Sequence, residues 1–259
     1  MNIIGIIPAR MAATRFPNKP LEKINGMPMI GHVYHRAKIC QNLSDVYVAT
    51  CDEAICEYIS SIGGKYIMTK ETHERATDRT GEALEKIMNK DGCKIDGVLM
   101  IQGDEPLLNP ILLDNMISFH MNQKTPFITN LISKIHDIDE FNNPNVVKVV
   151  KDKNGSILYM SRSPIPSNAK YSGRLPMWKQ LGLILFSKDA ILSYTKLIPS
   201  ELEIIESVDM NRILENNLII TAFPTEEFSQ AVDIPEDILV VDAIMLNDKL
   251  VTEYINNGI

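Results

Sequence analysis

The stretch "IIGIIPARMAATRFPNKPL", residues 3–21, opens the chain with an apolar run and continues into a basic loop. The run at 3–8 has no charged or polar side chain, which predicts a strand buried on both faces of a parallel sheet. Three cations, Arg10, Arg15 and Lys19, follow directly after it. Ligands of open α/β sheets bind beyond the carboxyl ends of the strands, so this loop is the first place to look for a site.

The composition is that of a globular protein with a negative net charge. Of 259 residues, 45% are hydrophobic and 23% are charged, and the formal net charge is −7. This balance argues against a nucleic-acid-binding surface, so any anion site has to be local. The four cysteines have no CxxC spacing and indicate reduced thiols. No apolar run approaches the ~20 residues of a membrane span. We therefore expect a cytoplasmic protein that binds neither nucleic acid nor membranes.

The first half of the chain alternates between strand and helix patterns. Strand-like runs lie at 3–8, 45–50 and 63–68, and another begins with "GVLMI" at residue 97. Between them, apolar residues recur at helical spacing, with runs that begin near Met29 and Ile55 and a third that covers 80–89. This alternation predicts a mostly parallel sheet with helices on both faces, the α/β class.

The middle of the chain has a different character. "NVVKVVKDKNGSILYMS" at 145–161 holds two strand-like runs around Asn154-Gly155, a strong hairpin signal. The polar residues 168–179 read as a loop, in which Trp178 serves packing. A buried strand at 181–186, a long helical pattern around 205–214, a strand at 218–223 and a terminal helix after Pro235 follow. We expect one domain over 1–259, a mixed sheet into which an antiparallel segment, roughly 126–180, is inserted.

The basic loop has the chemistry of a triphosphate site. Arginine binds phosphate oxygens bidentately and lysine supplies a point charge, as Arg10, Arg15 and Lys19 could do together. The small residues Ala12 and Ala13 would let backbone N–H groups approach a ligand as well. A solvated basic loop fits the spacing equally well, and the loop matches neither the P-loop nor the GxGxxG pattern.

Carboxylates follow a second apolar run. Gln102, Asp104 and Glu105 come after the strand that begins at residue 97, where a carboxylate can hold Mg²⁺ against phosphates. A polar turn is the alternative. Asp233, in "AVDIPED", is a second candidate ligand, although an aspartate just before Ile-Pro is more typical of a helix N-cap.

Two further groups of polar residues have simpler interpretations. "THERATDRTGE" at 72–82 concentrates charge before a helix, and Thr77 and Asp78 in it are natural N-caps. Lys148 and Arg162 belong to the predicted hairpin strands, where cations usually face solvent.

Taken in order, these segments resemble the CMP-Kdo synthetases, the 3-deoxy-manno-octulosonate cytidylyltransferases. The resemblance covers nearly the whole chain. The motifs that carry it are "IIPAR", "TRFPNKPL", "INGMPMIGHV", "VYVAT", "TDR", "IQGDEP", "NPNVVKVV", "LYMSRSPIP", "LG" at 181–182, "LE…E" within 202–206 and "VDIPED". It implies a nucleotide-diphospho-sugar transferase fold, CTP and an acidic sugar as substrates, Mg²⁺ as cofactor, and a homodimer formed through the inserted segment.

The resemblance also implies roles for individual residues. Arg10 and Lys19 would bind the CTP phosphates with help from Arg15, and Asp104 and Asp233 would hold Mg²⁺. The remaining assignments are Thr77 and Gln102 toward the nucleotide, and Gln102, Arg162, Gln180, Glu206 and Asp209 toward the sugar acid.

Some positions depart from the family pattern. Gln180 and Ile184 stand where a histidine and a tyrosine are common near the sugar acid, and Arg75 stands where a serine is usual. We expect Arg75 to bind an additional anionic group or to contribute to the nucleotide pocket. The expected reaction is transfer of CMP from CTP to a 2-keto-3-deoxy sugar acid with release of pyrophosphate. Activation of a different acid and a non-catalytic CTP-binding module are the alternatives.

Overall fold

The computed structural model describes residues 1–12, 16–91, 94–123, 127–227 and 230–257. The chain divides into two compact units, one made of residues 1–118 and 228–259 and the other of residues 119–227. The boundary at residue 118 falls within helix α4 (Pro110–Met121). The single domain expected from the sequence stays a prediction. No helix among the described residues is long and apolar enough to cross a bilayer.

The first unit is built on parallel strands in the order β6–β1–β4–β5. Ile6 in β1 pairs with Tyr47 in β4 on one side and with Met100 in β6 on the other. The elements are β1 (Ile3–Pro8), the 3-10 helix η1 (Lys19–Leu21), β2 (Lys23–Ile24), β3 (Met27–Pro28), α1 (Met29–Ile39), β4 (Asp45–Thr50), α2 (Glu53–Ser61), β5 (Lys65–Met68), α3 (Ala76–Asp91), β6 (Gly97–Ile101), α9 (Pro235–Met245) and α10 (Lys249–Asn257).

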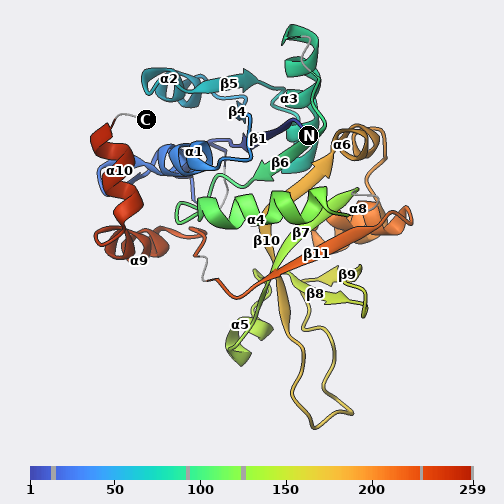
Figure 1. Ribbon diagram of the computed structural model, residues 1–259. Helices are drawn as coiled ribbons and strands as arrows, with labels where there is room; N and C mark the ends of the chain where they lie inside the picture. Colours follow the sequence, from blue (N-terminus) through green and yellow to red (C-terminus); the bar gives the residue numbers. More distant parts are fainter. Residues whose placement is uncertain (13–15, 92–93, 124–126, 228–229, 258–259) are drawn as a thin grey trace. The chain divides into compact units, whose positions relative to one another are not determined.

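The sequence predicted β1 and β6 because they are apolar throughout, and β4 and β5 because apolar residues predominate in them. Every residue of β6 is buried, and the isoleucines of β1 are at most 3% exposed. Helices α1 and α2 pack on β4, and α3 packs on β1 and β6. The terminal helix expected after Pro235 is a pair, α9 and α10. Figure 1 shows α10 beside α1, although the two are far apart in the sequence.

The second unit contains the antiparallel pairing. Strand β7 pairs with β10 antiparallel and with β11 parallel, while β8 pairs antiparallel with both β9 and β10. Figure 1 shows the segment between β9 and β10 as a long loop. The elements are β7 (Ile128–Lys134), α5 (Ile138–Asn142), β8 (Lys148–Lys151), β9 (Ile157–Ser161), β10 (Trp178–Ser187), α6 (Lys188–Tyr194), α7 (Glu201–Glu206), α8 (Met210–Glu215) and β11 (Ile220–Thr225).

The hairpin predicted at Asn154-Gly155 is confirmed as β8–β9. Gly155 has φ +91°, which L side chains rarely adopt, and the Asp152 carboxylate accepts hydrogen bonds from the backbone N–H groups of Asn154 and Ser156, at 2.8 Å each. Together with the parallel pairs of the first unit, this antiparallel pairing confirms the mixed, mostly parallel α/β class.

Three local predictions in the second unit are wrong. The long helix expected around 205–214 is two short helices, because Ser207 takes φ 52° and ends α7. Trp178 begins β10 instead of lying in a loop. Lys148, expected to face solvent, is fully buried and donates from Nζ to the carbonyls of Asn143 and Val146, at 2.8 and 2.6 Å, and of Arg162.

Candidate functional site

The carboxyl ends of β1 and β6 lie side by side, because the two strands are parallel neighbours at the point where the strand order of the sheet reverses. After β1 the chain adds β4 and β5 on one side, and it then crosses to place β6 on the other side. Such a switch point is where ligands bind in open α/β sheets. Both polar loops singled out in the sequence begin at this edge, one after β1 and one after β6.

Hydrogen bonds from neighbouring elements hold the loop after β1. The Ala9 N–H donates to the carbonyl of Ala49 in β4 at 2.9 Å. The Met11 N–H donates to the carboxylate of Asp52 at 2.9 Å, just beyond the same strand. Arg10 lies between these two ties with an exposed side chain. Arg15, the second cation of the predicted clamp, lies outside the described residues.

Lys19 links three segments that are distant in the sequence. Its Nζ donates to the carboxylate of Asp104 at 2.6 Å and to the backbone carbonyl of Val232 at 2.8 Å. The N–H of Val232 in turn donates to the backbone carbonyl of Asp104 at 2.9 Å. The loop after β1, the loop after β6 and the segment before α9 therefore meet at one point.

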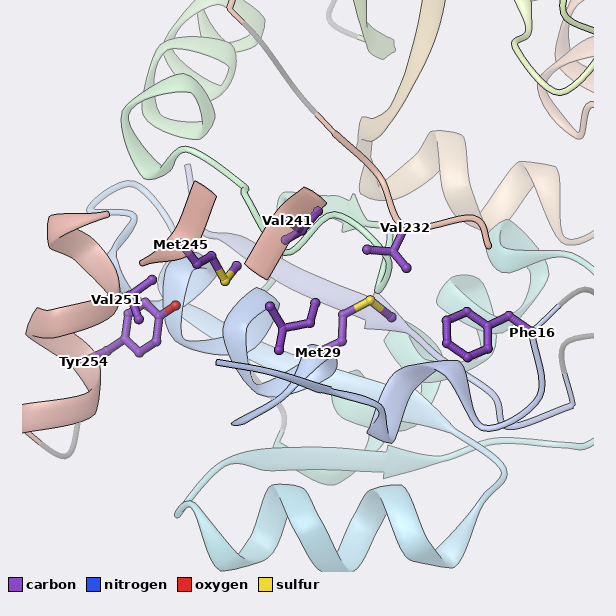
Figure 2. Close-up of a cluster of buried hydrophobic side chains, with 8 residues drawn as sticks. Phe16, Met29, Val232, Val241, Met245, Val251 and Tyr254 are labelled. Atoms are coloured by element: carbon purple, nitrogen blue, oxygen red, sulfur yellow. The ribbon is translucent and has the colours of Figure 1, made fainter. Parts of the chain in front are cut away.

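This meeting point places the backbone of Val232 against that of Asp104, and Asp233 is the next residue along the chain. The N-cap interpretation of Asp233 is wrong. Ile234 occupies the N-cap position of α9, and the Asp237 carboxylate accepts the backbone N–H groups of Asp233 and Ile234, at 2.7 and 3.0 Å. Figure 2 shows the side chain of Val232 in a buried cluster with Met29. The chain therefore leaves this cluster at Val232 and continues directly into Asp233.

The arrangement around Asp104 suits a cation. One oxygen of its carboxylate accepts from Lys19, while the other, Oδ1, is buried and has no hydrogen-bond partner within the described part of the chain. A buried carboxylate oxygen without a partner is costly unless something else satisfies it. No group of three or more His, Cys, Asp or Glu in the described residues could hold a metal ion. Mg²⁺ uses one or two protein carboxylates and takes its other ligands from phosphates and water, so Asp104 and Asp233 suffice as donors.

A cavity of about 370 Å³ opens at this edge. Cationic side chains outnumber carboxylates on its wall, which suits an anionic ligand. The residues that line it are Pro8, Ala9, Arg10, Lys19, Pro20, Met29, His73, Glu74, Arg75, Ala76, Arg79, Gln102, Gly103 and Asp104. Gly103 allows the chain to pass close to β1, because a Cβ there would lie 3.3 Å from the carbonyl oxygen of Pro8.

A polar network supports the wall of the cavity before α3. Arg79 is only 2% exposed, and its guanidinium donates to the Thr69 hydroxyl and to the carbonyl of His73. The His73 ring contacts the Glu82 carboxylate. Burial alone would raise the pKa of Glu82, but hydrogen bonds from Lys86, the Lys70 N–H and His73 outweigh it and hold that pKa at about 2. This charged stretch was predicted to cap the helix, with Thr77 and Arg75 in it assigned to the nucleotide or to an anion, but the roles of His73 and Arg79 in the wall were not predicted.

Thr77 and Gln102 differ in their access to the cavity. Gln102 lines it, as its predicted role requires. Thr77 is fully buried in the first turn of α3, where its hydroxyl lies 3.7 Å from the sulfur of Met100, and it is not part of the cavity wall. Gln102 therefore lies on the cavity wall and Thr77 does not, and the binding roles of both stay predictions.

Apart from Gln102, the residues predicted to face the sugar acid belong to the second unit. Arg162 donates from Nε to the carbonyl of Glu206 at 2.7 Å and from a terminal nitrogen to that of Pro144 at 3.0 Å. Burial alone would raise the pKa of Glu206, but hydrogen bonds from the Arg162 N–H and the Ser161 and Tyr159 hydroxyls lower it. Arg162, predicted to face solvent by its strand position, ties two loops together.

Gln180 in β10 and Asp209 at the start of α8 are two other residues of this unit that were predicted to bind the sugar acid. Gln180 donates to the side-chain oxygen of Asn130 at 2.8 Å, and Ile184, which stands where the family has a tyrosine, is buried. Asp209 is half-buried at the start of α8 without capping that helix. The substrate-binding roles of these residues stay predictions.

Sequence reasoning missed the contributions of backbone atoms. The Val232 carbonyl that receives Lys19 and the Met11 N–H that reaches Asp52 carry no residue-type signal. The only sequence signal for Asp52 is its place after the strand at 45–50, one position beyond Cys51.

Comparison with known proteins agrees with the site. A family model described as cytidylyltransferase matches residues 4–227. The 3-deoxy-manno-octulosonate cytidylyltransferase of Thermodesulfovibrio yellowstonii is 40% identical over 250 residues, which cover 93% of this chain and 97% of the relative. The 8-amino-3,8-dideoxy-manno-octulosonate cytidylyltransferase of Shewanella pealeana is 39% identical over 253 residues, with coverage of 96% and 100%.

A solved structure extends this likeness to three dimensions. CMP:2-keto-3-deoxy-manno-octonic acid synthetase in complex with CTP superposes with a TM-score of 0.86 at 32% identity, covering 95% of this chain and 99% of that one. The family model spans most of the sequence, and relatives near 40% identity span nearly all of it. The chain, with its cation-lined cavity at the strand ends, therefore belongs to the cytidylyltransferase family.

Proposed function

We propose that this protein transfers CMP from CTP to a 2-keto-3-deoxy sugar acid, either 3-deoxy-manno-octulosonate (Kdo) or a close relative of it, and releases pyrophosphate. The contact of Lys19 with both Asp104 and Val232 supports the proposal most, because it joins a cation, a carboxylate and the residue before Asp233 at a cation-lined cavity. The relatives named above and the synthetase solved with CTP support the choice of nucleotide.

In the proposed reaction, the anomeric hydroxyl oxygen of the sugar acid attacks the α-phosphorus of CTP. A new P–O bond forms, the bond from the α-phosphorus to the bridging oxygen breaks, pyrophosphate leaves, and the hydroxyl proton passes to solvent. Lys19 and Arg10 bind the phosphates and stabilise the charge that grows on the departing pyrophosphate. Gln102 on the cavity wall orients the nucleotide or the acid. Positioning and charge neutralisation supply most of the rate in such transfers.

Asp104 and Asp233 would hold Mg²⁺, and the unpartnered Oδ1 of Asp104 supports that assignment. Bound there, Mg²⁺ would supply positive charge against the phosphates and lower the pKa of a coordinated hydroxyl. Asp104, which also pairs with Lys19, would keep that charge close to the ammonium group. The ammonium group already lies 2.6 Å from the Asp104 carboxylate, so one end of the phosphate chain would meet both cations.

The nature of the acceptor depends on the sugar-acid pocket. Relatives named for Kdo and for its 8-amino-3,8-dideoxy form match this chain about equally well, at 40% and 39% identity. The buried Ile184 and the Gln180–Asn130 hydrogen bond give this chain a different set of side chains from the common histidine and tyrosine. A modified octulosonate is therefore the second candidate acceptor.

Pyrophosphate release with CTP, Mg²⁺ and a panel of acids tests the proposal. Release with Kdo or with the 8-amino form supports cytidylyl transfer and identifies the acceptor. Release only with an unrelated acid contradicts the acceptor class, and tight CTP binding with no release for any acid indicates a binding module. Asp104→Asn is expected to lower turnover at least a thousandfold, about 4 kcal/mol, without unfolding the chain. Asp189→Asn, with a side chain 85% exposed, is the control.

The setting of the reaction is also a proposal. The family resemblance supports a cytoplasmic homodimer that acts in lipopolysaccharide biosynthesis. Light scattering of the purified protein checks the dimer, and a mass equal to one chain at working concentration would contradict it.

A further inference from the structure

The segment that carries Asp233 belongs to the first unit and packs against its C-terminal helices. Val232 is fully buried, and its side chain packs in a cluster with residues of the N-terminal loop, α1, α9 and α10. Figure 2 shows Val232, Val241, Met245, Val251 and Tyr254 contributing from the C-terminal end of the chain. Both backbone groups of Val232 meanwhile face the site, toward Lys19 and Asp104.

Polar contacts from α1 hold α10 in place at the end of this cluster that contains Tyr254. The hydroxyl of Tyr254 lies 2.6 Å from Nδ1 of His32, and the ring of Tyr254 stacks on His35 with centroids 5.3 Å apart. Arg36 is only 2% exposed, pairs with Asp248 between α9 and α10, and donates to the carbonyl of Leu108 at 3.1 Å. These contacts fix α10 against α1.

The tautomer of His32 determines which group donates the hydrogen bond between His32 and Tyr254. Nε2 of His32 lies 2.7 Å from the carbonyl oxygen of Ile24, so Nε2 carries the ring proton. Nδ1 therefore accepts, and the Tyr254 hydroxyl is the donor. A buried histidine whose ring nitrogens are both used in this way holds the tyrosine in one orientation. A second tie lies on α9, where the Asp242 carboxylate accepts the backbone N–H of Asn25.

We propose that Tyr254 is a positioning residue for the metal site: its hydrogen bond to His32 seats the α9–α10 pair, and that pair sets the backbone of Val232 and the carboxylate of Asp233 beside Asp104. The inference rests on the proposed function in one respect, the role of Asp233 as a metal ligand. Tyr254 belongs to the last helix of the chain and acts only through the packed cluster and Val232. Tyr254 is not among the residues that line the cavity.

Amide hydrogen exchange of full-length Tyr254→Phe tests the proposal directly. The phenylalanine keeps the ring in the cluster and removes the hydroxyl, which donates to His32 and also contacts Arg36. The Val232 amide, which donates to Asp104, is expected to exchange about tenfold faster, while the amides of Ile4–Ile7 in β1 keep their rates. Unchanged exchange at Val232, or an equal increase in β1, would overturn the proposal. Tyr66→Phe, at an exposed tyrosine of β5, is the matched control.

Mn²⁺ titration of the CTP-bound protein, without acceptor, gives a second readout. Tyr254→Phe is expected to weaken Mn²⁺ binding three- to tenfold and to leave the affinity for metal-free CTP unchanged. Asp248→Asn, which loosens the grip at Arg36, is expected to act in the same direction and covers the case in which Tyr254→Phe folds poorly. Wild-type Mn²⁺ affinity in both variants refutes the positioning role. Asp233→Asn with wild-type Mn²⁺ affinity would instead refute the metal assignment, and the Val232 exchange rates would still decide whether Tyr254 seats this segment.

Discussion

Cations in the two units of this protein end in different surroundings. In the first unit, Arg10 and Lys19 lie on the wall of a cavity, and Lys19 reaches a carboxylate whose other oxygen has no partner in the described residues. In the second unit, Arg162 donates to backbone carbonyls and Arg212 forms a buried pair with Glu203. The residue type is similar, but only the first set keeps its charge facing a space that a ligand can enter.

Lys148 is the extreme case in the second unit. It is fully buried with its Nζ surrounded by three backbone carbonyls, and burial lowers its pKa. A cation in such a position closes the turn at 143–146 over β8 and has no donor left for a substrate. Whether a cation binds a ligand or supports the structure therefore depends on which partners its donor nitrogens have, more than on the presence of the charge.

The largest expected effect lies in the second unit. Arg212→Met should lower the free energy of unfolding by about 3–5 kcal/mol, because it leaves the Glu203 carboxylate, 1% exposed, without its ion-pair partner. Chemical denaturation measures this change, with the exposed Arg174→Met as control. CTP affinity of the folded variant should stay at the wild-type value. A variant as stable as the wild type, or one that loses CTP affinity first, would break the distinction between the two cation sets.

Lys19→Met reverses the pattern. We expect kcat/KM to fall about a hundredfold to a thousandfold, roughly 3–4 kcal/mol, while the free energy of unfolding changes by less than about 1 kcal/mol. The ammonium contributes to phosphate binding, and its ion pair lies where solvent reaches both side chains, at 15% and 22% exposure. Steady-state kinetics with CTP check this. Lys134→Met, at an exposed pair with Glu226, is the control, and a Lys19 variant within threefold of wild-type kcat/KM contradicts the prediction.

Sequence patterns predicted the elements whose signals are local. The strand at 97–101 is apolar throughout, the strand at 45–50 is mostly apolar, and Asn154-Gly155 has the turn chemistry of a hairpin, so each could be predicted from a short window of sequence. The break in the helical pattern at Ser207 could not, since neither proline nor glycine marks it and its φ of 52° is set by packing and by the hydrogen bond from the Val208 N–H to the Glu203 carbonyl.

The candidate site also has features that the sequence predicts and features that it does not. Asp104 was predicted because it follows a buried strand, and Asp233 because the family resemblance aligned it. The contacts of Val232 with Lys19 and with the Asp104 backbone were not predictable, because they depend on a backbone N–H, which every residue type except proline has, and on a backbone carbonyl, which every residue type has. The burial of Thr77 and of Lys148 likewise depends on what packs over them, which no short window records.

Each unit contains a buried histidine whose pKa is lowered, and the pH dependence of stability tests this feature. Burial lowers the pKa of His32 in the first unit and of His120 in the second, from 6.5 to about 4 in each case. Each folded-state pKa lies below the unfolded value, so both rings stay neutral on folding. Their contribution to stability is complete above pH 6.5 and is lost as the pH falls toward 4, at about 1.4 kcal/mol per pH unit for each ring.

The measurement is the free energy of unfolding at pH 7.5 and at pH 5.0. Replacing either histidine by glutamine should reduce the difference between the two values by about 2 kcal/mol, since one ring no longer resists protonation. His136→Gln, at an exposed histidine, should leave the difference unchanged. A wild-type pH dependence in both buried-site variants would show that neither ring is held neutral.

The smallest effect concerns a cation that departs from the family pattern. Arg75 is half-buried on the cavity wall just before α3, where the family commonly has a serine. If it belongs with Lys19, Arg75→Ser should raise KM for CTP three- to tenfold, about 1 kcal/mol, and leave kcat unchanged, because it removes binding shared by ground and transition states. Arg174→Ser is the control. The increase should shrink at high salt, because screening weakens an exposed phosphate contact. A fall in kcat, or a change in KM for the acid alone, would place Arg75 outside the nucleotide-binding set and move it toward the acceptor.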